Sequence, residues 1–487
     1  MSEFKKISNW INGELSTNED ADILEKYDPH SGGLQSYFPD SDITDVNNAI
    51  DAADKAFPAW SALTSVNRGQ ILMRLVDQMK AHQDDLANCV AYETGKKIID
   101  AKGEVTASIM QAEFFASEGM RLYGQSLNSS VPEKTSFTIR QPHGIAGLIV
   151  PANTPIANIA WKIFPALICG NTVVLKSSED APEVAELFAT ITKKASLPNG
   201  VLNVVHGKGD KSGAMIVSDP RIKVISFTGS TDVGIKIADT ANKRLARVSL
   251  ELGGKNPFIV CDDADIENAV HWAVLSAFSN AGQRCASGSR LIIFKDIYAT
   301  FKEKLLLKTA SLKLGIEADC DLGPVVNKKQ QENILKAIDN IKLDNGVILC
   351  GGVAPSDEHL ANGFYIEPTI IEGLSQEAYL NKHEVFGPVA TLTKVENIYE
   401  ALNIANDSSY GLTSSIHTRD INKAIWFAKN VKSGVANINF GTYGSEPHMP
   451  FGGFGLSGNG SREPGTEAIN VYSELKNISI LSSSEVI

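Results

Sequence analysis

The sequence lacks a paired cysteine pattern, an excess of positive charge and an uninterrupted apolar run. Its six cysteines form no CxxC pair, which excludes a zinc signature and a disulfide framework. The formal net charge of −12 argues against nucleic acid and anionic membranes as partners. The most apolar stretch, residues 144–175, holds three prolines and a lysine, so it is no simple membrane span. MSEFKKISNW lacks a signal-peptide core, and we expect a cytoplasmic protein with reduced thiols.

The chain is long enough for more than one domain. It has 487 residues, 43% of them hydrophobic, which is an ordinary globular composition. Between residues 145 and 252, β-branched apolar runs alternate with helical patterns. The expected strands are 146–150, 172–175, 201–205, 223–227 and 247–252, and the expected helices are 156–168, a segment from 182, 211–217 and 232–241. This alternation predicts a parallel sheet covered on both faces, with ligands beyond the carboxyl ends of its strands.

A second alternating series predicts a second α/β domain. Its expected strands are 256–261, 290–294, 346–350 and 434–439, and its expected helices are 264–280, 297–312, 328–341 and 421–430. A helical pattern at 68–89 indicates a further helical layer on the first domain.

Polar residues follow the first two strands of the first series. Asn153 follows one strand, where its amide can donate a hydrogen bond to a ligand; the alternative is a turn asparagine. Lys176 and Glu179 follow the next strand. A lysine there suits a phosphate or a ribose hydroxyl, whereas a carboxylate suits a ribose diol and repels a 2′-phosphate. The alternative is a solvated charge pair near a helix start.

The later strands end in glycine-rich segments. Gly229 and Ser230 stand where a strand meets a helix, and free amides at a helix start favour an anion such as a pyrophosphate. The glycines of HGKGDKSG miss the GxGxxG spacing by one residue, so we expect a turn there. Glu251 lies just before Gly253 and Gly254, where the backbone can approach a ligand closely. The alternative is a strand-edge carboxylate that pairs with Lys255. Cys285 follows among small, polar neighbours in NAGQRCASGSR, which is unusual for a structural thiol.

Together these segments resemble the aldehyde dehydrogenase superfamily. The resemblance covers essentially the whole chain from about residue 56, and it is carried by AFPAWS, AYETGKK, GLIVPANTP, AWKIFPALICGNTVVLKSSE, FTGSTDVG, LELGGKNP, NAGQRCAS, GFYIEPTI, EVFGPV, NDSSYGLTSSI and MPFGGFGLSG. It implies that Cys285 is the nucleophile, that Asn153 and the Cys285 amide form an oxyanion site, and that Glu251 is the general base.

The resemblance also implies a nicotinamide cofactor and no metal. Lys176 and Glu179 would hold the adenosine ribose, Gly229 and Ser230 the pyrophosphate, and Glu384 and Phe386 the nicotinamide ribose and ring. Relatives often carry proline after the lysine, where this chain has serine, but the glutamate is retained. We therefore expect NAD, with NADP as the alternative.

The implied reaction oxidises an aldehyde to a carboxylic acid through a cysteine thiohemiacetal and a thioester. Transfer of the thioester to coenzyme A is one alternative, which the presence of Glu251 disfavours. A catalytically silent binding protein on the same scaffold is another.

The resemblance places the substrate entrance at residues 110–120 and 440–448. Its expected pocket residues are Gln111, Phe114, Arg284, Tyr443 and His448, which suit a short polar or acidic semialdehyde.

The expected division is a doubly wound dinucleotide-binding domain (1–122 and 142–252), an α/β catalytic domain (253–454) and a small β oligomerisation arm (123–141 and 466–487). Relatives dimerise through such an arm, so we expect a homodimer or homotetramer.

Overall fold

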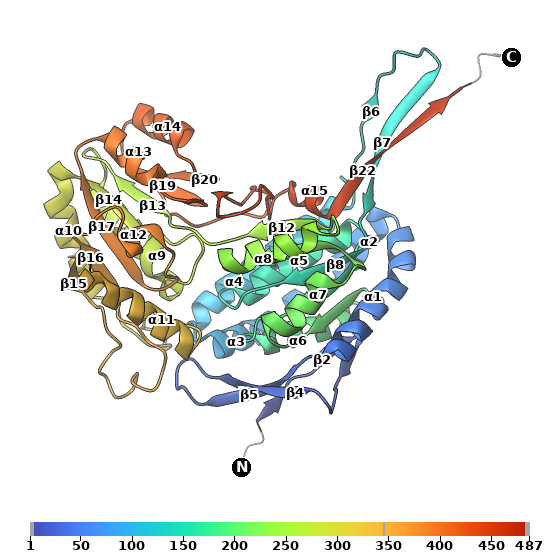
Figure 1. Ribbon diagram of the computed structural model, residues 1–487, viewed down its shortest axis with the longest axis horizontal. Helices are drawn as coiled ribbons and strands as arrows, with labels where there is room; N and C mark the ends of the chain where they lie inside the picture. The colour runs from blue at the N-terminus through green and yellow to red at the C-terminus, as the bar shows by residue number, and fades with distance from the viewer. Residues whose placement is uncertain (1–3, 344–345, 483–487) are drawn as a thin grey trace.

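The computed structural model describes residues 4–343 and 346–482, so the outermost residues of the first domain and of the arm lie outside it. Two seven-stranded sheets, each covered by helices, lie side by side, and a narrow β arm projects from one of them (Figure 1). Among the described helices, none is long and apolar enough to cross a bilayer.

The first sheet contains the five expected strands as its parallel centre. Its order is β12-β11-β8-β9-β10-β2-β3, and β10, β2 and β3 pair antiparallel. The expected strands are β8 (Ile145–Ile149), β9 (Thr172–Lys176), β10 (Leu202–Val205), β11 (Ile222–Thr228) and β12 (Arg247–Glu251). The last two strands on the β10 side, β2 (Asn9–Ile11) and β3 (Glu14–Ser16), were not predicted.

Helices cover both faces of this sheet because its strands are apolar on both. Val173 and Leu175 of β9 pack into the core on one face, and Val174 between them packs into the core on the other. The first face carries α2 (Ser65–Ala81), α3 (Gln83–Thr94), α4 (Ile98–Glu118), α5 (Pro155–Ile168) and α6 (Pro182–Lys194). The second face carries α1 (Ile43–Ala62), α7 (Ala214–Ser218) and α8 (Thr231–Asn242).

The helical pattern at 68–89 is divided between two helices, α2 and α3. The break falls at His82, whose φ of −111° and ψ of 23° are not helical. The His82 N–H donates to the carbonyl of Gln78, and its ring Nδ1 lies 2.8 Å from the same oxygen. The ring therefore competes for a helix carbonyl and favours the end of α2.

The second sheet has the order β15-β16-β17-β14-β13-β19-β20. Its expected strands are β13 (Pro257–Val260), β14 (Arg290–Phe294), β15 (Val347–Cys350) and β20 (Val435–Ile438). Three others were not predicted: β16 (Thr369–Glu372), β17 (Val389–Val395) and β19 (Thr413–His417). Its helices are α9 (Ile266–Phe278), α10 (Lys295–Ala310), α11 (Lys328–Asp339), α12 (Tyr379–Lys382), α13 (Ile398–Asn406) and α14 (Ile421–Asn430).

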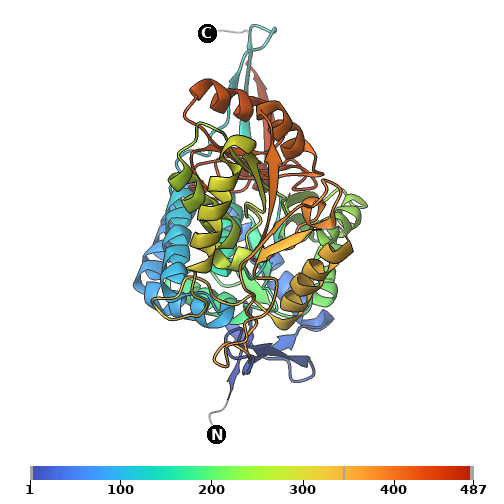
Figure 2. The same cartoon turned by 90° about the vertical axis from the view of Figure 1, so that its left-hand side faces the viewer.

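The arm is a three-stranded sheet, in line with the β arm that the resemblance implies. It pairs β22 (Ser473–Leu481) with β7 (Lys134–Pro142), and β7 with β6 (Ser126–Leu127). The C-terminal strand begins at Ser473, because the residues before it form α15 (Ala468–Tyr472), which packs against α5. The arm projects at the opposite end of the molecule from the sheet of β1 (Lys5–Lys6), β4 (Asp22–Tyr27) and β5 (Leu34–Asp40) (Figure 2).

The remaining elements are short. They are η1 (Gly209–Gly213), η2 (Ser279–Gly282), η3 (Asn340–Leu343) and the paired strands β18 (Tyr410–Gly411) and β21 (Phe454–Gly455).

The order of the first sheet determines where a ligand can bind. The chain builds β8, β9 and β10 in one direction and then returns to place β11 and β12 on the other side of β8. The loops after β8 and β11 therefore diverge and leave a crevice at the carboxyl edge. Asn153 and Gly229 follow these two strands, and Glu251 ends the next one.

Candidate active site

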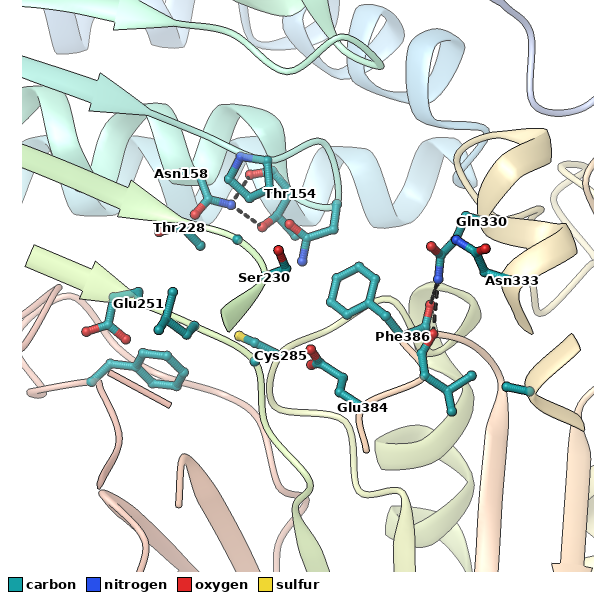
Figure 3. Close-up of a pocket in the computed structure, with 18 of the residues that line it drawn as sticks. Thr154, Asn158, Thr228, Ser230, Glu251, Cys285, Gln330, Asn333, Glu384 and Phe386 are labelled. Carbon is teal, nitrogen blue, oxygen red and sulfur yellow. Dashed lines mark hydrogen bonds between the residues drawn. The ribbon is translucent and has the colours of Figure 1, made fainter. Parts of the chain in front are cut away.

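A cavity of about 740 Å³ lies at this carboxyl edge, between the two sheets (Figure 3). Residues from both halves of the chain line it. Seven predicted site residues are among them: Asn153, Gly229, Ser230, Glu251, Cys285, Glu384 and Phe386. The structure thus brings together groups that are up to 233 positions apart, from 153 to 386.

Cys285 sits on a loop whose shape is set by its backbone. After α9, Asn280 and Ala281 adopt φ values of 56° and 53°, and Gly282 follows with 68°. These left-handed residues turn the chain toward the cavity. Asn256 then fixes the loop, because its Nδ2 donates to the carbonyls of both Cys285 and Ser287 at 2.8 Å.

The Cys285 thiol is protonated at neutral pH in this environment. Burial raises its pKa to about 12, with further contributions from the charges of Glu384 and Glu251, and Arg284 opposes them only weakly. The Arg284 guanidinium carbon lies 4.8 Å from the centre of the Tyr443 ring, and its Nε donates to Ser279 at 3.2 Å. Arg284 is therefore engaged by the ring and the serine and does not form the thiolate by itself.

Glu251 is a buried carboxyl group facing the same cavity. Neither side-chain oxygen has a hydrogen-bond partner among the described residues, so the pairing with Lys255 is absent. Burial, followed by the nearby Glu463, raises its pKa well above the usual range, while Lys162 opposes the shift. An unpartnered buried carboxyl group can accept a hydrogen bond and then a proton from a water in the cavity.

The Asn153 side chain is oriented by the cysteine loop. Its Nδ2 donates to the carbonyl of Gln283 at 3.0 Å, whereas its Oδ1 has no partner in the part of the chain that the structure describes. An amide nitrogen carries two hydrogens, so one remains for a group in the cavity.

The opposite wall carries Glu384 and Phe386. The Gly254 N–H donates to Oε1 of Glu384 at 3.1 Å, and burial raises the pKa of this carboxyl group to about 7. Phe386 has a φ of 56°, an unusual conformation for a bulky residue. Gln330 holds it there, because its Nε2 donates to the carbonyls of Val385 and Phe386 at 3.0 Å each.

Lys176 and Glu179 lie beyond the cavity lining, at the end of β9. They form an ion pair of 2.9 Å, and Oε1 of Glu179 accepts the Gly209 N–H at 2.7 Å. Gly209 opens the short π-helix η1 in the near-GxGxxG segment, whose glycines do not line the cavity. At the start of α8, Ser230 lines the cavity and its hydroxyl caps no helix amide, so it is free to meet an anion.

The five expected substrate residues are brought together only in part, and none lines the main cavity. Tyr443 packs against the same small apolar cluster as Cys285 and carries Arg284 on its ring. Phe114 and His448 line a second, outer cavity of about 490 Å³. Gln111 is buried in α4, with its Nε2 unpartnered among the described residues.

Two aromatic residues of the cavity were missed from the sequence. Trp161 and Phe451 line it beside Cys285, and their ring centroids are 5.8 Å apart. Both lie in the quoted segments AWKIFP and MPFGGFG, so the motifs contained the signal, but the interpretation concentrated on polar groups.

Comparison with known proteins identifies the family. The profile of the aldehyde dehydrogenase family matches residues 16–478. The chain is 38% identical to the alpha-ketoglutaric semialdehyde dehydrogenase of Bacillus subtilis, over 96% of this chain and 97% of the relative. It is 37% identical to the phenylacetaldehyde dehydrogenase of Pseudomonas fluorescens, over 97% and 94%. The crystal structure of betaine aldehyde dehydrogenase from Staphylococcus aureus, in complex with NAD+, superimposes with a TM-score of 0.96 at 30% identity, covering 99% of this chain and 95% of that one.

The chain therefore belongs to the aldehyde dehydrogenase family. This confirms the enzyme class and the α/β fold predicted from the sequence.

Proposed function

We propose that this enzyme oxidises an aldehyde to a carboxylic acid with Cys285 as the nucleophile. The observation that carries the proposal is that Cys285, Asn153 and Glu251 line one cavity. This cavity lies at the carboxyl edge of the first sheet, where doubly wound folds bind dinucleotides. The Cys285 thiol first gives up its proton, through a water, to the Glu251 carboxylate in the same cavity. Attack of the resulting thiolate on an aldehyde carbonyl forms a tetrahedral alkoxide. The free N–H of Asn153 and the Cys285 amide stabilise that oxygen, and one such donor is typically worth about 3 to 4 kcal/mol.

Glu251 is the general base for the hydrolysis of the resulting thioester. Its oxygens have no partner in the described chain, so a water can occupy that place and lose a proton to the carboxylate. This arrangement supports hydrolysis rather than transfer to coenzyme A, since the latter needs no base for water.

A nicotinamide dinucleotide fits the residues along the edge of the sheet. When bound, NAD(P)+ accepts the hydride that the substrate loses. Ser230 and the start of α8 suit the pyrophosphate, and Glu384 suits ribose hydroxyls. Gly253 supports this fit, because only a residue without a Cβ leaves the Glu384 carboxyl group in its place at the cavity. A Cβ at position 253 would lie 2.7 Å from the carboxyl carbon of Glu384. Phe386, held by Gln330, would contact the nicotinamide ring.

We favour NAD over NADP because of Glu179. Its carboxylate is fixed by the Gly209 amide and Lys176, and a negative charge there repels a 2′-phosphate. Replacing Glu179 with serine is expected to narrow the preference for NAD in kcat/KM. An unchanged ratio would remove Glu179 from this role.

We propose a short polar or acidic semialdehyde as the substrate. The similarity to the Bacillus subtilis enzyme supports it, as does the polar pair of Arg284 and Tyr443, since Tyr443 packs against the same cluster as Cys285. The Trp161–Phe451 pair and the similarity to the phenylacetaldehyde enzyme favour an aromatic aldehyde as the second candidate. His448, Phe114 and Gln111 would act further out, at the entrance.

We further propose the domain division expected from the sequence, with residues 123–141 and 466–487 as the arm of a homodimer or homotetramer. Exposed apolar side chains on β22, including Leu475 and Ile480, support assembly through it. A cytoplasmic location is consistent with the six free cysteines.

The decisive test is a panel of aldehydes assayed with NAD and NADP. Oxoglutaric, succinic and glutaric semialdehydes would be compared with phenylacetaldehyde by kcat/KM. An acidic semialdehyde is expected to give the highest value with NAD, with no change on adding coenzyme A. Higher values for phenylacetaldehyde would select the aromatic alternative, and acyl-coenzyme A as product would exclude the hydrolytic route.

A further inference from the structure

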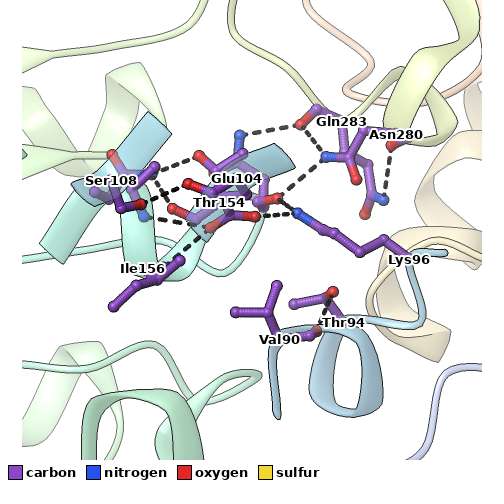
Figure 4. A network of polar contacts seen from close by, with 12 residues as sticks. Val90, Thr94, Lys96, Glu104, Ser108, Thr154, Ile156, Asn280 and Gln283 are labelled. Atoms are coloured by element: carbon purple, nitrogen blue, oxygen red, sulfur yellow. Dashed lines mark hydrogen bonds and ion pairs between the residues drawn. The ribbon is translucent and has the colours of Figure 1, made fainter. Parts of the chain in front are cut away.

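A buried ion pair lies behind the loop that carries Asn153 (Figure 4). Lys96, in the connection between α3 and α4, places its Nζ 2.5 Å from Oε2 of Glu104 on α4. Both residues are less than a tenth exposed. Desolvation offsets most of the attraction in a buried pair, so stability alone is a weak explanation for it.

The ion pair contacts both ends of the segment that enters α5. Lys96 Nζ donates to the main-chain carbonyl of Asn153 at 2.8 Å. The other oxygen of Glu104 accepts the N–H groups of Ile156 and Ala157, at 3.0 and 3.3 Å. These two amides belong to the first turn of α5, which has no carbonyl partners for them. The pair thus fixes the backbone on either side of Thr154.

The cysteine loop holds the same carbonyl from the other side. Asn280 Nδ2 donates to the carbonyl of Asn153 at 3.1 Å and to that of Gln283 at 3.2 Å. The Asn153 side chain donates to Gln283 in turn. The backbone of Asn153 is therefore clamped between Lys96 and the loop that presents Cys285.

We infer that Lys96 is a positioning residue for the oxidation: it fixes the Asn153 carbonyl and thereby aims the Asn153 amide at the oxygen that becomes negative on attack by Cys285. This inference rests on the proposed role of Asn153. A side chain attached to a shifted backbone moves with it, and a displacement of about 1 Å at a reacting group can reduce the rate about a hundredfold.

The test uses Lys96→Met combined with Glu104→Gln. The double variant leaves no unpaired charge, and the Gln oxygen can still accept the two α5 amides. The measurements are the single-turnover rate of NADH formation and the KM for the best aldehyde of the panel. We expect the rate to fall at least tenfold while this KM changes less than threefold. Lys102 lies on the same helix as Glu104 and forms an exposed ion pair with Asp84 of α3; Lys102→Met removes this pair, is the matched control and should leave both unchanged.

The same double change is also made in an Asn153→Ala background. If Lys96 acts through Asn153, the double change causes no further fall in the single-turnover rate in this background. A further fall of the same factor as in the wild-type background would overturn the inference. An unchanged rate in the first experiment would also overturn it. Asn280→Gly keeps the left-handed backbone and removes the second donor to the Asn153 carbonyl. It must also lower the single-turnover rate, and must cause no further fall in the Asn153→Ala background. If the double variant does not fold, Asn280→Gly replaces it in the experiment. An Asn153→Ala enzyme with the wild-type rate would instead reject the oxyanion role itself, without reference to Lys96.

Discussion

Gly253 offers a sharp test of how the cavity holds Glu384. A Cβ at position 253 would lie 2.7 Å from the carboxyl carbon of Glu384 and closer still to its Oε2, whereas ordinary contacts of this kind are 3.4–4 Å. In Gly253→Ala the carboxylate must therefore move by about 1 Å, which breaks its 3.1 Å hydrogen bond from Gly254. The displaced carboxylate would no longer meet the ribose hydroxyls of NAD, and a hydrogen bond to a charged group is worth about 1.5 to 3 kcal/mol. The expected result is a rise in the KM for NAD of about tenfold to a hundredfold.

The assay compares the KM for NAD with the KM for the aldehyde, and both with the thermal unfolding temperature. Gly103→Ala is the matched control, because among the described residues no side chain or backbone comes within 4 Å of its added Cβ. Alanine in the middle of α4 should leave the KM for NAD unchanged and stabilise the fold by about 0.5 to 1 kcal/mol. If Gly253→Ala binds NAD as the wild type does, Glu384 is not a cofactor residue in the way proposed.

Two further predictions concern the thiols. Cys285→Ala should lose aldehyde oxidation, whereas Cys169→Ala should retain it because Cys169 is buried in the core away from the cavity; an active Cys285→Ala enzyme would reject the nucleophile. Because the folded enzyme raises the pKa of Cys285 to about 12, the thiol is neutral at pH 7, and its alkylation by iodoacetamide in the absence of cofactor should accelerate about tenfold per pH unit from pH 7 to 9. A rate that is already at its plateau at pH 7 would mean that the thiolate is preformed.

The cofactor side of the site was predictable because parallel strands all end at one edge. Once β8, β11 and β12 are recognised by their apolar runs, Asn153, Gly229 and Glu251 must meet there. The arm was expected from the resemblance to relatives that dimerise through such an arm. The sequence could not reveal that Glu251 has no hydrogen-bond partner among the described residues or that Phe386 adopts a positive φ, because tertiary contacts decide both.

Other features lacked a local signal. The strands β2 and β3 have three residues each, which is too short for a period-two pattern. β19 reads TSSIH, whose polar side chains are buried by the fold and not marked by hydropathy. The break at His82 is made by its own ring, which an apolar period does not register. The sequence could not show which predicted substrate residues lie together, because tertiary contacts decide it: Phe114 and His448 line the outer cavity, whereas Arg284 lies on the Tyr443 ring.

The central claim is that Cys285 forms a covalent acyl intermediate that Glu251 helps to hydrolyse. In the most direct measurement, the Glu251→Gln enzyme is mixed with aldehyde and NAD, and NADH is followed from the first turnover. The mass of the peptide that contains Cys285 is then measured by mass spectrometry. The account predicts a burst near one NADH per site, slow turnover afterwards and the mass of one acyl group on Cys285. Steady turnover at the wild-type rate without a burst, or an acyl group on another residue, would contradict it.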